Sequence, residues 1–131
     1  MIYIKQYIVT AVMFFAVDIL WLGVLAKGLY KRYIGHLMAD KVVLGAALAF
    51  YMIYIGGLLF FVIQPALRKE SFNHALMTGF IFGFITYATY DLTNMATLKD
   101  WPLMITIIDI AWGTCLGGAV SALSYVILSR F

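Results

Sequence analysis

Residues 103–128 read LMITIIDIAWGTCLGGAVSALSYVIL, an apolar run whose only charged side chain is Asp109. An α-helix needs about 20 mostly apolar residues to cross the hydrocarbon core of a bilayer, and this run is long enough. Backbone groups in lipid must find their hydrogen bonds within the segment, which favours a helix over an isolated strand. We therefore predict a transmembrane helix here.

The composition of the whole chain also indicates a membrane protein. Of its 131 residues, 65% are apolar and 11% are charged, whereas soluble domains are about 45–50% apolar and about 25% charged. A soluble core in so short a chain could not bury that much apolar surface. With Cys115 as the only cysteine, a disulfide-rich module is also excluded. The net charge of +3 is too small for a nucleic-acid footprint, so membrane lipid is the expected partner.

Three further stretches share this apolar character, so we expect an all-α membrane protein with four transmembrane helices in an up-down bundle. The bundle forms a single domain over residues 1–131. Short polar junctions separate the spans, which makes consecutive helices antiparallel. Pro65, together with Arg68, Lys69 and Glu70, is expected to close the second span, and Asp18 argues against the first being a cleaved signal peptide. The expected spans are about 4–26, 42–64, 72–96 and 103–128.

The connection after the first span has a pattern of its own. Over about residues 28–40, apolar residues such as Leu29, Tyr33 and Leu37 recur at helical spacing, and basic residues take the other positions. This pattern predicts an amphipathic segment at the lipid headgroups. The alternative is a loop whose apolar side chains pack on the bundle.

Three of the expected spans each carry one carboxylate, namely Asp18, Asp91 and Asp109. A charge at the centre of a membrane helix costs at least a few kcal/mol, so such residues are functional candidates by default. Each lies roughly 10–14 Å from its helix end, and in a four-span topology these three ends face the same side. Tyr51 lies at a similar depth on the second span. We therefore expect one polar layer inside the bundle.

A hydrogen-bond donor follows each acid by three residues, on the same helix face. An indole N–H can only donate and a carboxylate accepts, so each acid has a donor on its own helix. Tyrosines are expected around the layer, either as packing or as ligand contacts. The candidate ligand-binding or proton-binding residues are Asp18, Asp91, Asp109, Trp21, Asn94, Trp112, Tyr51 and Tyr87.

Small residues recur at intervals of four on the last two spans. Gly79 and Gly83 precede Asp91 on the third span, and Gly113 and Gly117 follow Asp109 on the fourth. Small residues at this spacing let membrane helices approach closely, so the acids are expected to face the bundle interior. The same glycines could instead form a face for a homo-oligomer or a membrane partner.

Three carboxylates in a low dielectric cannot all be charged at little cost, so we expect a proton or a cation among them. The leading hypothesis is binding or transport of a small ion, an amine or a lipid headgroup, coupled to protons. One alternative is a membrane enzyme acting on lipid or a lipid-soluble metabolite. Another is a non-catalytic subunit or scaffold in which the acids only hold the helices together.

Motifs of well-known catalytic sites are absent. The sequence has no phosphate-binding glycine loop, no nucleophile elbow and no zinc-protease motif. Its two histidines, His36 and His74, fall near opposite membrane faces. We therefore predict no cofactor and no metal, and assign no catalytic residue.

The run YATYDLTNMATLKDWP at residues 87–102 resembles the signature of a bacterial family of small membrane proteins, catalogued only as a domain of unknown function. The segments DILWLG at 18–23 and DIAWG at 109–113 also match, and the resemblance covers essentially the whole chain. It implies a four-span protein in the bacterial cytoplasmic membrane. It implies no activity and no site residue.

Overall fold

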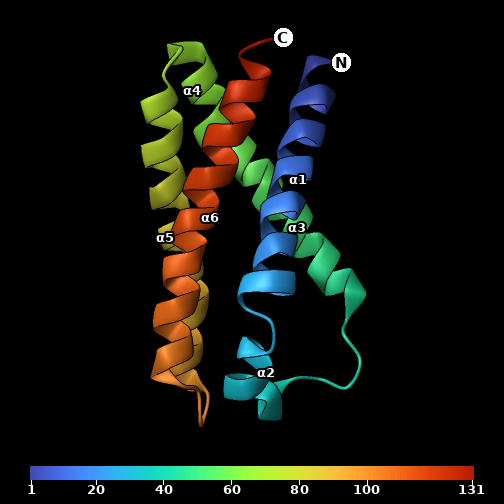
Figure 1. Ribbon diagram of the computed structural model, residues 1–131, viewed down its shortest axis with the longest axis vertical. Helices are drawn as coiled ribbons and strands as arrows, with labels where there is room; N and C mark the ends of the chain where they lie inside the picture. Colours follow the sequence, from blue (N-terminus) through green and yellow to red (C-terminus); the bar gives the residue numbers. More distant parts are fainter.

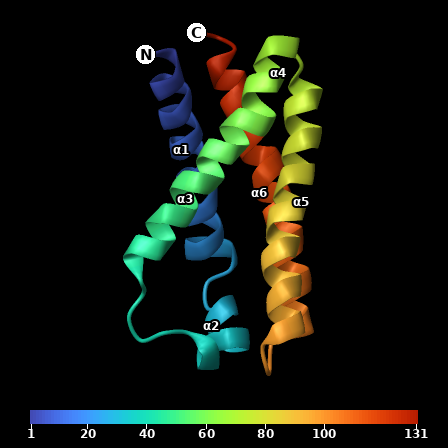
Figure 2. The ribbon, with the colours of Figure 1, turned by 180° about the vertical axis from the view of Figure 1, so that it is seen from behind.

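The computed structural model describes residues 1–131, and every regular element in it is helical. In Figures 1 and 2, α1 and α5 run one way along the molecule, α3–α4 and α6 run the other way, and both termini lie at one end. The elements are α1 (Ile2–Leu20), η1 (Trp21–Leu25), α2 (Leu29–Ile34), η2 (Gly35–Leu37), α3 (Leu44–Leu58), η3 (Leu59–Ile63), α4 (Gln64–Lys69), α5 (Phe72–Thr97) and α6 (Leu103–Leu128).

Three helical stretches are long and apolar enough to cross a membrane: Ile2–Leu25, Leu44–Lys69 and Leu103–Leu128. The α5 helix is as long as α6, but its polar residues make it less apolar than these three. The outer surface carries many exposed large apolar side chains, among them Ile19, Ile53 and Ile81. A soluble monomer rarely exposes so much contiguous apolar surface, so this exterior fits contact with lipid.

The second stretch ends at Lys69, among the four residues expected to close it, Pro65, Arg68, Lys69 and Glu70. The helix therefore runs a little beyond residue 64, and Pro65 lies inside it. Pro65 has no N–H to donate, which the first turn of a helix tolerates. It stands in the first turn of α4, directly after the π-helical turn η3, where the regular hydrogen-bond register already changes.

The α5 and α6 helices are in backbone contact along their glycines. A Cβ added to Gly79 would lie 2.5 Å from the carbonyl oxygen of Gly117, and one added to Gly83 would overlap the carbonyl of Gly113. No side chain other than hydrogen fits at this distance. The glycine stripe of α5 is therefore used within the chain, and is not free to serve as an oligomer face.

Gly83→Ala is expected to destabilise the protein by about 1–3 kcal/mol, because the added methyl group overpacks this contact. Alanine is the better helix former by about 1 kcal/mol, so any loss reflects the packing. Thermal unfolding in detergent micelles, followed by circular dichroism, measures it. Gly45→Ala is the matched control, since nothing lies within 4 Å of its added Cβ. Equal melting temperatures for the two variants would contradict the close approach.

The connection between α1 and α3 is only partly helical. Gly28, with a left-handed φ of 79°, interrupts the chain before α2, and η2 is followed by an extended stretch up to α3. The expected amphipathic helix over 28–40 is thus shortened to α2 and one 3₁₀ turn. In Figure 1, α2 lies at the end of the molecule opposite the termini.

The largest buried apolar cluster lies in the half of the molecule nearer the termini. It includes Phe14 of α1, Leu58 of α3, and Leu116 and Val120 of α6, all of them fully buried. Asp91 and Asp109 lie toward the other end of α5 and α6, and Asp109 accepts a hydrogen bond from Tyr30 of α2.

Candidate functional site

Two of the three predicted acids face each other across the α5–α6 contact. The close glycine packing sets the register of the two antiparallel helices, and it brings Asp91 opposite Asp109. Their carboxyl groups lie within hydrogen-bonding reach. Asp91 is 0% exposed and Asp109 is 7% exposed. Neither oxygen of Asp91 receives a hydrogen bond from a donor group of the protein, so a shared proton would satisfy the pair.

A tyrosine from the connection after α1 completes the environment of Asp109. The hydroxyl of Tyr30, in α2, donates to Oδ1 of Asp109 at 2.8 Å, and Nε1 of Trp21 donates to the Tyr30 oxygen at 3.0 Å. Burial first, and then the nearby Asp109 carboxylate, raise the pKa of Tyr30. The phenol therefore stays protonated and acts as a donor to Asp109.

The tryptophans do not pair with the acids of their own helices. The rings of Trp21 and Trp112 stack with centroids 4.4 Å apart and an interplanar angle of 7°. Trp21 donates to Tyr30. The N–H of Trp112 approaches Asp18 of the other helix, but makes no hydrogen bond. The Trp21 indole is therefore directed to Tyr30 of α2, and the Trp112 indole to Asp18 of α1.

The third expected pair is also absent. Asn94 does not donate to Asp91, whose oxygens have no donor, and it lies beside the phenol of Tyr90 instead. The donor predicted for each acid on its own helix is therefore wrong in all three cases.

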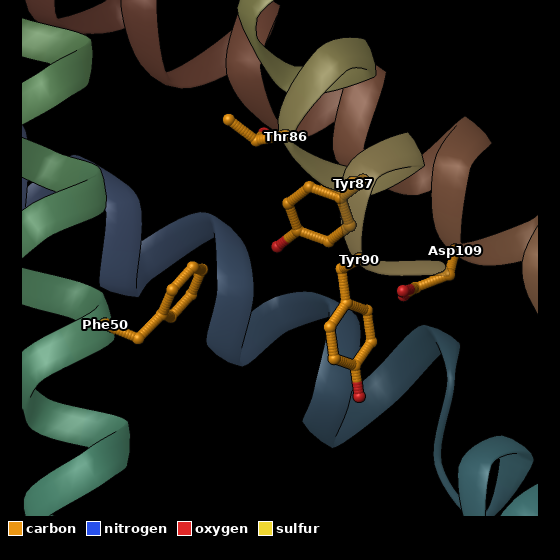
Figure 3. Close-up of a pocket in the computed structure, with 5 residues that line it drawn as sticks. All are labelled: Phe50, Thr86, Tyr87, Tyr90 and Asp109. Atoms are coloured by element: carbon orange, nitrogen blue, oxygen red, sulfur yellow. The ribbon is translucent and has the colours of Figure 1, made fainter. Parts of the chain in front are cut away.

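A cavity of about 320 Å³ adjoins the paired acids. Figure 3 shows Tyr87, Tyr90 and Asp109 directed into the space that faces Phe50 of α3. Asp109 is the only charged residue in the lining, and Phe50 and Tyr90 are about half exposed, so the cavity reaches the surface between α3 and α5. Its lining residues are Phe50, Thr86, Tyr87, Tyr90 and Asp109.

Asp18 and Tyr51 lie outside this cavity lining. Asp18 is half-buried, and Tyr51 packs edge-on against Phe14 and Phe15, with centroids 5.6 and 5.4 Å away. The acids do not form a group of three that could hold a metal ion. The site is therefore a carboxyl pair beside an aromatic cavity, with Asp18 to one side.

Sequence reasoning missed Tyr30, Phe50 and Thr86 as site residues. Tyr90 is one of the tyrosines expected around the polar layer, and it lines the cavity. Nothing local marks Tyr30, because its role depends on where the chain returns after α1.

A family model described as Predicted membrane protein (DUF2177) matches residues 3–126. The match confirms the resemblance carried by residues 87–102. No curated protein and no solved structure matches the chain.

Proposed function

We propose that this chain, which belongs to the DUF2177 family of predicted membrane proteins, binds a small organic cation in exchange for a proton. One observation carries the proposal: the fully buried Asp91, whose oxygens lack donors, faces Asp109 at the edge of an aromatic cavity. A buried carboxylate without a partner costs several kcal/mol. A positive species, either a proton or a ligand, is therefore required at the pair.

The exchange follows from the charge of the pair. Two facing carboxyl groups cannot both ionise at little cost, so they share one proton, which leaves a single negative charge. An ammonium ion that enters beside Asp109 supplies the positive charge that the proton supplied before. Loss of the shared proton then returns the site to its original net charge of one negative charge. Exchange of the proton for the ammonium ion is therefore the least costly outcome.

The cavity walls favour an organic cation over a metal ion. Calcium and magnesium need about six or more oxygen ligands, whereas this lining consists mainly of the rings of Phe50, Tyr87 and Tyr90. Aromatic faces attract ammonium groups. A volume of about 320 Å³ is near the lower end for ligand pockets, which indicates a small ligand. The opening between α3 and α5 suits a cation with apolar substituents.

We also propose that α5 is a fourth membrane span, in a bacterial cytoplasmic membrane. It packs against α6 by direct backbone contact, and α6 is apolar enough to span, so the two share the same depth. The polar residues of α5 include the buried Asp91 and two residues of the cavity lining, Thr86 and Tyr87. Polar groups that face the bundle interior are compatible with a spanning helix.

Calorimetric titration of the purified protein with choline tests the proposal. Choline is expected to bind at least about tenfold more tightly than its uncharged tert-butyl isostere, dimethylbutanol, because only choline replaces the positive charge of the proton. In weakly buffered solution with a pH indicator, choline binding is expected to release up to one proton per chain. A protein that binds neither choline nor a panel of other small ammonium ions would overturn the proposal.

A further inference from the structure

We infer that Tyr30 positions the exchangeable proton: its hydroxyl keeps Asp109 ionised, so that the proton shared by the pair lies on Asp91. This inference rests on the proposed exchange, but its geometry is independent of any ligand. The phenol reaches Asp109 from α2, 79 residues away in the chain, with a donor–acceptor distance of 2.8 Å.

The two acids have unequal hydrogen-bond environments. Asp109 receives the Tyr30 hydroxyl, whereas Asp91 receives no donor at all. A hydrogen bond to an ionised carboxylate is about twice as strong as one between neutral groups, so the negative charge is more stable on Asp109. A protonated Asp91 can then donate to Asp109, which satisfies both acids with one proton.

Trp21 strengthens the hydrogen bond from Tyr30 to Asp109. Its N–H donates to the Tyr30 oxygen at 3.0 Å, and a hydroxyl that accepts a hydrogen bond becomes a better donor. Trp21 is itself held by stacking on Trp112. The hydrogen-bonded series Trp21–Tyr30–Asp109 thus joins η1, α2 and α6 at the site, and it leaves the ionised carboxylate of Asp109 at the cavity lining.

Several other titratable groups face Asp109. They are carboxyl or phenol groups, with no lysine or arginine among them, so none supplies the positive charge that would stabilise an ionised Asp109. Tyr30 is the only one from which Asp109 accepts a hydrogen bond. These groups are Asp18 of α1, Tyr30 of α2, and Tyr87, Tyr90 and Asp91 of α5.

Infrared difference spectroscopy of the protein without ligand tests the inference. The protonated carboxyl group gives a carbonyl band that disappears as the pH rises, and Asp91→Asn is expected to remove this band. Tyr30→Phe removes the hydroxyl and keeps the ring, so ionised Asp109 loses its donor and the proton is held more tightly. The midpoint of the titration is expected to move up by about one pH unit.

Two matched variants separate this effect from a structural one. Tyr33→Phe removes a hydroxyl from the same short helix, where no hydrogen bond reaches the site, and is expected to leave the midpoint unchanged. Trp21→Phe retains an aromatic ring for stacking but removes the donor behind Tyr30, so a smaller shift in the same direction is expected. If Tyr30→Phe does not fold, Trp21→Phe still tests whether this donor sets the midpoint.

The inference is overturned if Tyr30→Phe shows the same titration midpoint as Tyr33→Phe. If Tyr30→Phe does not fold, the same comparison is made with Trp21→Phe. This outcome is distinct from failure of the proposed function. A wild-type protein that binds no ammonium ion but shows the shifted midpoint would retain the positioning role of Tyr30 and lose the exchange.

Discussion

Replacement of Asp109 by asparagine is expected to lower the affinity for choline by at least about 100-fold. Asp109 is the only charged residue that lines the cavity, and removal of one member of a buried charge pair costs about 3–5 kcal/mol, where 1.4 kcal/mol is tenfold. Asparagine has nearly the same size, and its amide oxygen can still accept from Tyr30. The loss is therefore expected in binding, as measured by calorimetry, with the helical content preserved.

Asp40→Asn is the control for a general charge effect. Asp40 is exposed in the connection before α3, so its substitution removes one negative charge without touching the cavity. Its affinity for choline is expected to equal that of the wild type. If Asp109→Asn bound choline within about threefold of Asp40→Asn, Asp109 would not be the counter-ion of the ligand.

Asp91→Asn is expected to separate binding from proton release. The variant keeps Asp109 as the counter-ion, and its amide can donate to Asp109 in place of the shared proton. Choline should still bind, within about tenfold of the wild type at high pH, with no proton released to the indicator dye. Wild-type affinity should rise with pH by up to about tenfold per unit, because the proton and the cation compete. The variant's affinity should not change with pH over the same range.

A proton released by Asp91→Asn in the same amount as by the wild type would show that the exchanged proton does not belong to this pair. Asp18→Asn then provides the comparison, since Asp18 is the remaining acid near Asp109. A loss of release in Asp18→Asn alone would assign the proton to Asp18, which would overturn the exchange at the pair.

Much of the architecture could be predicted from local features of the sequence. Hydropathy predicts that the stretch containing Asp109 is a membrane-capable helix, because burial in lipid depends on the composition of each segment alone. The four-residue spacing of Gly79 and Gly83 predicts a close helix contact for a similar reason, since this spacing keeps both residues on one helix face. The positions of Asp91 near the end of α5 and of Asp109 near the start of α6 also follow from counting residues along the helices.

The partners of these residues could not be predicted in the same way. Spacing on one helix suggested that Trp21 donates to Asp18 and Trp112 to Asp109, but Trp21 donates to Tyr30 of α2 and Trp112 approaches Asp18 of α1. The second span was expected to end at about residue 64, yet the helix passes Pro65 after a π-helical turn and ends at Lys69. Both outcomes depend on how neighbouring turns and helices are placed, which single-segment patterns do not encode.

Apolar helical segments and the place of each acid along its helix can be read from the amino-acid sequence, because both depend on residues close together in the chain. The pairing of Asp91 with Asp109, and the donor supplied by Tyr30, become visible only in the folded molecule. A hydrogen bond of 2.8 Å between groups 79 residues apart requires the register of α5 on α6 and the path of the connection after α1 to be set together.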